Sequence, residues 1–130
     1  MRSMTRGEFE KIVAEVGLHA VPERFRGAVK NVAFLVEDEP SDEVREEEGL
    51  AEDETLFGLY RGVPHTERGE LYGVGVTLPD TITLYQKPIE EEGEGDSEKV
   101  REIVCETIWH EVAHHFGLGH GDMRDRGHDA

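Results

Sequence analysis

The chain has 130 residues, of which 36% are hydrophobic and 34% are charged, and this predicts one globular domain over residues 1–130. Its 30 acidic and 14 basic residues give a formal net charge of -16, which disfavours nucleic-acid binding, and no apolar stretch approaches the roughly 20 residues of a membrane-spanning helix. Because Cys105 is the only cysteine, an internal disulfide is excluded, and any metal ion must be held by histidine and carboxylate side chains.

A first amphipathic helix is predicted over residues 6–16. Thr5 and Glu8 have the spacing of a capping box at its start, and Gly17 follows it as a C-terminal stop. The apolar residues of one face recur at helical spacing, at Phe9, Ile12, Val13 and Val16. Since the chain opens with charged residues in this pattern and not with an apolar leader, we expect a cytoplasmic location.

The middle of the chain is predicted to alternate short elements with polar segments. Pro22 suits the first turn of a second, shorter helix that ends at about Val29. Residues 32–36 are expected to form a strand that is buried largely on both faces. The acidic run 37–48 is expected to be a solvated loop or an exposed helical turn, and a second strand is predicted at residues 56–60.

A third strand is predicted at residues 81–86, where apolar and polar side chains alternate. Lys87 and Pro88 follow it directly, as at the end of an edge strand, because proline cannot donate a hydrogen bond to a neighbouring strand. Residues 90–96 are expected to be an acidic linker that contains glycine.

The longest predicted element is a helix over residues 98–117, with Ser97 as its N-cap and Gly117 as its left-handed end. The order of elements is therefore helix, helix, strand, strand, strand, helix. That order is typical of an α+β fold with a small mixed sheet packed on helices and the last helix near the C-terminus.

The last helix contains the motif H-E-x-x-H, with histidines at His110 and His114 and Glu111 between them. Residues four apart lie one turn apart on the same side of a helix, so both imidazoles can reach one metal ion. Glu111 is rotated to one side of the two histidines, where it can hold a water molecule without binding the metal itself. The spacing therefore predicts two metal ligands and a general base.

A catalytic zinc ion usually has three protein ligands and an open fourth position. Gly117 lets the backbone turn sharply, so His120, three residues later, is the best candidate for the third ligand. The other candidates are Asp122, His128, His65 and His19.

Several residues near the motif have weaker predicted roles. His115 falls within the apolar arc of the helix and is expected to be a core histidine. Glu106, one turn before His110, is either a solvated carboxylate or a hydrogen-bond acceptor that orients that imidazole. The side chains that can donate to a developing oxyanion are Tyr60, Tyr85 and His65.

From about Val32 to His120 the chain resembles the small bacterial zincin-like metallopeptidases, sometimes called minimal zincins. Three ordered segments carry the resemblance: Leu56 to Pro64 with Thr66 to Arg68, then Leu78 to Tyr85 with Lys87 and Pro88, then His110 to Gly117. The resemblance implies a minimal zincin-like core, a zinc ion on His110 and His114, and Glu111 as the general base. It also implies that the strand at residues 81–86 borders the cleft, where a peptide adds as a further strand.

The chain departs from larger relatives in two ways. The pattern H-E-x-x-H-x-x-G-x-x-H is similar to that of metzincins, but Met123 comes only three residues after His120 and is not assigned their methionine turn. The chain also lacks the large lower subdomain of most zincins, so substrate pockets are shallow or completed by a second copy of the chain, and the oligomeric state stays open.

The first functional hypothesis is a zinc-dependent metallopeptidase that hydrolyses peptide or protein substrates, with zinc on His110, His114 and His120 and with Glu111 as the base. The second is a non-catalytic module in which zinc is structural and the cleft only binds a peptide. The third is a metal-dependent endoribonuclease, because bacterial rRNA-maturation endoribonucleases have a similar three-histidine spacing. Glu111, which that family lacks, and the net charge of -16 argue against the third hypothesis.

Overall fold

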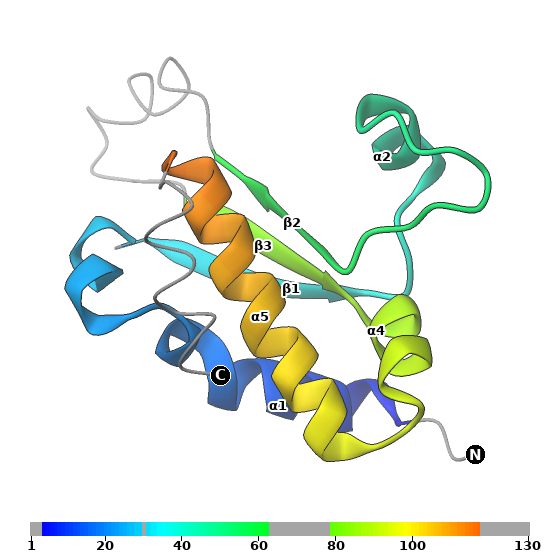
Figure 1. Cartoon of the computed structure of the whole chain (residues 1–130), viewed down its shortest axis with the longest axis horizontal. Coiled ribbons are helices and arrows are strands. Elements are labelled where there is room, and N and C mark those ends of the chain that lie inside the picture. Colours follow the sequence, from blue (N-terminus) through cyan, green and yellow to red (C-terminus); the bar gives the residue numbers. More distant parts are fainter. Residues whose placement is uncertain (1–3, 30, 63–78, 118–130) are drawn as a thin grey trace.

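The computed structural model describes residues 4–29, 31–62 and 79–117. Helix α5 lies across one face of a three-stranded sheet, and α1 packs beside it (Figure 1). The arrangement is an α+β fold, as the sequence predicts. In chain order, with η for 3-10 helices, the elements are α1 (Arg6–Val16), η1 (Gly17–Ala20), η2 (Glu23–Ala28), β1 (Val32–Glu37), α2 (Asp42–Glu47), β2 (Gly58–Arg61), β3 (Asp80–Tyr85), α4 (Gln86–Gly93) and α5 (Ser97–His115).

The sheet has the strand order β1-β3-β2, with β3 parallel to β1 and antiparallel to β2. The prediction that residues 81–86 form an edge strand is wrong, because β3 is the central strand and pairs on both sides. No edge of β3 is therefore free to accept a peptide. The strand that lies at the sheet edge and packs against α5 is β2.

Strand β1 forms where the sequence predicts it, but it is not buried on both faces. Phe34 and Val36 pack against the hydrophobic core, whereas Leu35 is 44% exposed on the opposite face. Alternate residues of a strand point to opposite faces, and the helices α1 and α5 cover only one of them (Figure 1).

The N-terminal helix α1 matches its prediction closely. The Thr5 hydroxyl accepts a hydrogen bond from the Glu8 backbone, and the Glu8 carboxylate accepts one from the Thr5 backbone, so the capping box is complete. Gly17 ends the helix with a positive φ of 37°. Within the acidic run, α2 has no buried residue and is the exposed helical turn that the sequence allows.

Helix α4 (Gln86–Gly93) occupies residues that the sequence predicts as the end of a strand and the first part of a linker, so the linker prediction is wrong for residues 90–93. Pro88 lies in its first turn, where a missing N–H leaves no hydrogen bond unmade. Ile89 is fully buried, and Gly93 packs so closely on α5 that an added Cβ would lie 2.8 Å from Cγ2 of Val100. The acidic residues here thus cover one side of a packed helix.

Helix α5 is the central helix of the fold. Its N-cap is Asp96 and not Ser97, because the Asp96 carboxylate accepts hydrogen bonds from the backbone N–H groups of Glu98 and Lys99. A buried stripe follows at every fourth residue, at Val100, Val104, Ile108 and Val112. Gly117 follows the helix with a φ of 67°, in the left-handed conformation. None of the described helices is long and apolar enough to cross a membrane.

Candidate active site

The H-E-x-x-H residues lie in the last two turns of α5, beside its buried stripe. His110 and His114 are both exposed, and their ring centroids lie 6.4 Å apart with the planes tilted by 38°. A zinc ion at about 2.1 Å from one nitrogen of each ring needs centroids about 5 Å apart. Exposed side chains can make this change by rotating about their χ angles. The helix therefore presents two exposed histidines, one turn apart, whose rings must come closer together to share one metal ion.

Glu111 is half-buried between α5 and the sheet. Its Oε1 accepts a hydrogen bond of 3.0 Å from the backbone N–H of Tyr60 on β2. Burial raises the pKa of the Glu111 carboxyl above its usual range, while that N–H and the neighbouring His110 and His114 act in the opposite direction. A carboxylate with a raised pKa beside two exposed imidazoles is suited to proton transfer.

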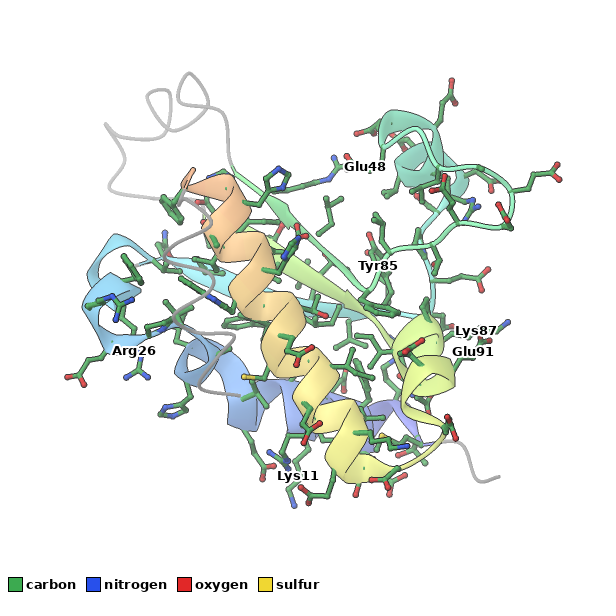
Figure 2. All side chains as sticks on the ribbon, viewed as in Figure 1. Lys11, Arg26, Glu48, Tyr85, Lys87 and Glu91 are labelled. Atoms are coloured by element: carbon green, nitrogen blue, oxygen red, sulfur yellow. The ribbon has the colours of Figure 1, made fainter. Side chains whose placement is uncertain are left out.

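Two hollows lie along the edge of β2, and His110 and Glu111 line both of them. One hollow has a volume of about 520 Å³ and extends toward the N-terminal half of α5. The other has a volume of about 440 Å³ and extends toward the end of that helix and Glu48, which caps α2 (Figure 2). Together they form a cleft with the two motif residues at its centre, and we refer to it below as the β2 cleft.

The edge of β2 that does not pair with β3 faces this cleft. The Tyr85 N–H donates to the carbonyl of Phe57, so residues 57 and 59 are hydrogen-bonded to β3 and the alternate residues point away from it. Those alternate residues are Gly58 and Tyr60. The Tyr60 N–H points away from the sheet to Glu111, and the backbone groups of Gly58 face the open edge.

Gly58 allows β2 to approach α5 closely. An added Cβ would lie 2.7 Å from Cγ2 of Thr107 and 2.9 Å from the carbonyl oxygen of Thr83, and the latter is a backbone atom that cannot move away without a shift of the strand. We expect Gly58→Ala to lower the free energy of unfolding by about 1 to 3 kcal/mol, as overpacking usually does. Chemical denaturation measures this, with Gly27→Ala as the matched control because an added Cβ there meets nothing within 4 Å. Equal stability of the two variants would contradict the close approach.

Tyr60 is fixed on three sides. Its hydroxyl donates to Oδ2 of Asp80 at 2.7 Å, and its ring stacks on His115 with the ring centroids 3.9 Å apart. The Phe116 ring packs edge-on against it, with the centroids 6.0 Å apart. The side chain is 8% exposed. The hydroxyl therefore points to Asp80 and not toward the cleft, which does not fit an oxyanion donor.

Two further predictions about neighbouring side chains need correction. His115 is exposed and lines the β2 cleft, so it is not a core histidine. Tyr85 (Figure 2) is only 2% exposed and is too buried to donate to a substrate. Glu106 lines the cleft as an exposed carboxylate and makes no hydrogen bond to His110 among the described residues.

The described residues supply no third ligand for a metal ion on His110 and His114. Within residues 4–29, 31–62 and 79–117, no three histidine, cysteine or carboxylate side chains group together in a way that could hold a metal ion. His19 lies in η1 and belongs to no such group. The remaining candidates, which are His120, Asp122, His128 and His65, lie outside the described residues.

The parts of the site that β2 contributes are not evident in the sequence. These are the N–H of Tyr60, the close approach at Gly58 and the aromatic contact of His115. Each depends on a pairing between residues far apart in the chain. The only local signal is a glycine inside a predicted strand, which often marks a close backbone approach.

Comparison with known proteins identifies the family of the chain. A family model described as zincin-like metallopeptidase matches residues 29–128, a range that includes all three strands, α5 and the H-E-x-x-H motif. None of the curated proteins compared with the chain matches it. Because the family match covers well over half of the 130 residues, the chain belongs to the zincin-like metallopeptidase family.

Proposed function

We propose that the protein is a zinc-dependent peptidase and that Glu111 is its general base. The observation that carries the proposal is the half-buried Glu111 carboxylate, held by β2 beside two exposed histidines at the centre of an open cleft. A closed structural zinc site needs neither an adjacent base nor an open cleft. The family supports a metallopeptidase in general, and the residue roles that follow are our proposal.

We assign zinc binding to His110, His114 and His120. Zinc, when bound, supplies a Lewis acid that polarises a carbonyl and lowers the pKa of water. Neutral imidazole is the usual nitrogen ligand of zinc, and rotation of the two exposed side chains on α5 would bring both rings within reach of one ion. His120 completes the set in the sequence pattern, although it lies outside the described residues.

Glu111 moves the proton in the proposed reaction. One of its oxygens is held by the Tyr60 N–H, and the other makes no hydrogen bond to the described residues, so it is available to accept a proton from the attacking water. Burial raises the pKa of the Glu111 carboxyl toward neutral pH, and a carboxylate with a higher pKa holds the accepted proton more strongly. The protonated side chain then donates to the nitrogen of the leaving amine as the peptide bond breaks.

The edge of β2 is the proposed binding surface for the peptide backbone. An extended peptide can pair with the outward N–H and carbonyl of Gly58, in the manner of an added strand. Such pairing places a peptide carbonyl beside His110 and Glu111, because both residues line the hollows along that edge. Side chains on either side of the scissile bond would then enter the two hollows.

The charge of the β2 cleft predicts a preference among substrates. Its described lining contains Glu48, Glu92 and Glu106 in addition to the base, and no lysine or arginine. Peptides with Lys or Arg beside the scissile bond should therefore have kcat/KM values about tenfold higher than matched peptides with Asp or Glu, and the ratio should fall as salt is added. Matched fluorogenic peptides at low and high ionic strength measure this. Equal cleavage of both sets would contradict it.

The same lining bears on the endoribonuclease alternative. A phosphate backbone entering the β2 cleft would meet these carboxylates without a described lysine or arginine to offset them. The non-catalytic module remains the alternative that shares the metal site. It differs from the proposal only in whether a bound peptide is cut.

The experiment that tests the proposal is a search for metal-dependent cleavage. Zinc-loaded protein is incubated with a diverse peptide library, and cleavage sites are read by mass spectrometry before chelation, after chelation and after zinc is restored. We expect cleavage that is lost with the chelator and recovered with zinc. Zinc binding without cleavage of any peptide would instead support the non-catalytic module.

A further inference from the structure

The proposed base, Glu111, belongs to one element of the fold, and its carboxylate is hydrogen-bonded by another. Glu111 belongs to α5, but the only hydrogen bond that the described residues make to its carboxylate comes from the backbone of Tyr60 on β2, 51 residues earlier in the chain. A glutamate has three rotatable side-chain bonds, so one oxygen must be fixed if the other is to face a reacting water reproducibly. The placement of the base therefore depends on the placement of residue 60 relative to α5.

Residue 60 contacts α5 at two points one helical turn apart. Its N–H binds Glu111, and its ring stacks on His115, with centroids 3.9 Å apart and planes only 18° from parallel. Glu111 and His115 are four residues apart, so they lie on the same side of the helix. One strand residue thus spans one turn of the helix that carries the proposed metal ligands.

The same ring is also anchored to the sheet. The Tyr60 hydroxyl donates to Asp80 at the start of β3, and its side chain is almost fully buried. Gly62, just beyond β2, leaves room for the His115 ring, because a Cβ there would lie 3.1 Å from Cε1 of His115. The stack therefore joins β2, β3 and the last turn of α5.

We propose that the aromatic stack of Tyr60 on His115 is a positioning device for Glu111. The stack holds β2 against the last turn of α5 and so keeps the Tyr60 N–H on the carboxylate. His115 acts through Tyr60 and is a positioning residue, and what it contributes is the flat face of its ring. The effect on turnover rests on the proposed peptidase function, whereas the effect on the Tyr60 N–H does not.

The test compares His115→Ala, which removes the stack, with His115→Phe, which keeps an aromatic face but no ring nitrogen. Hydrogen exchange of the Tyr60 amide, followed by NMR on the full zinc-loaded chain, reports the contact directly. We expect exchange of this amide to become about tenfold faster in His115→Ala and to remain near the wild-type rate in His115→Phe. The internal control is the amide of Leu59, which faces β3 and should be unaffected. Glu111→Ala gives the exchange rate of a Tyr60 amide without its acceptor.

The second readout separates positioning from loss of stability. We expect His115→Ala to lower kcat about tenfold with little change in KM or zinc affinity, and His115→Phe to restore most of it. Tyr60→Phe keeps the stack and loses the hydroxyl bond to Asp80, so it should lower the free energy of unfolding while the exchange of the residue 60 amide stays close to the wild-type rate.

The outcomes test the positioning role and the peptidase function separately. Unchanged Tyr60 exchange in His115→Ala overturns the positioning role, and so does a His115→Phe variant as impaired as His115→Ala, since the ring nitrogen would then be the group that matters. Absence of hydrolysis by the wild-type protein overturns the peptidase proposal alone. In that case the exchange rates still show whether the stack holds the Tyr60 N–H on Glu111.

Discussion

Glu111→Gln is expected to bind zinc as the wild type does and to hydrolyse peptides at least about a thousandfold more slowly, within the range found for removal of a general base. The amide has the size of the carboxylate and keeps an oxygen that can accept the hydrogen bond from the Tyr60 N–H, so the site keeps its shape. It cannot accept a proton from water. Single-turnover kinetics with a cleavable peptide, together with the zinc content of the same sample, measure both parts of the prediction.

The matched control for this variant is Glu102→Gln. Glu102 lies on the same helix and is exposed, and it does not line either hollow of the β2 cleft among the described residues. The same loss of one carboxylate there should leave kcat and KM unchanged, which separates the role of Glu111 from a general effect of net charge. Hydrolysis at the wild-type rate by zinc-loaded Glu111→Gln would exclude Glu111 as the base and would assign proton transfer to another group.

The parts of the fold that depend on short-range patterns could be predicted from the sequence. The capping box of Thr5 and Glu8 and the glycine at position 17 define α1 without reference to the rest of the chain. The same holds for His110 and His114, because the helix alone sets their relation. The family match over residues 29–128 confirms what the ordered motifs suggest about the family.

The strand order could not be predicted, because it depends on contacts between distant segments. Residues 81–86 alternate as a half-buried strand does, and Lys87 with Pro88 is typical of a strand edge. In the structure those two residues begin α4, where a proline in the first turn costs no hydrogen bond. The parallel pairing of β1 with β3 places that strand in the centre of the sheet and moves the open edge to β2.

The misplacement of His115 has a similar cause. A helical projection assumes that all residues on the apolar side of α5 pack into one core. His115 falls on that side, so the projection predicts that it is buried. The last turn of α5 instead passes the end of β2, where Tyr60 provides an aromatic surface and the opposite side is open. The side chain is therefore a wall of the cleft, and only the path of β2 determines this.

His120→Ala is expected to weaken zinc binding by more than about a hundredfold, because even residues that only support a ligand contribute 10- to 100-fold to metal affinity. Two histidines from α5 leave a zinc site one protein ligand short of the usual catalytic set. Gly117 ends the helix with a φ of 67°, so the chain leaves the helical path three residues before His120. Competition with a chromophoric chelator measures the affinity, and elemental analysis of protein purified without chelator or affinity metal measures the occupancy.

The controls for His120→Ala are the other candidate ligands of the C-terminal residues, as Asp122→Asn and His128→Ala. If zinc is held by His120, both controls keep wild-type affinity, and His120→Ala loses metal and hydrolysis together. Loss of zinc in a control, with His120→Ala unaffected, assigns the third ligand to that residue and leaves Glu111 as the base. A wild-type chain that takes up no zinc even when it is offered in excess would remove the metal from the site, and the peptidase proposal with it, since Glu111 alone has no means to polarise a peptide carbonyl.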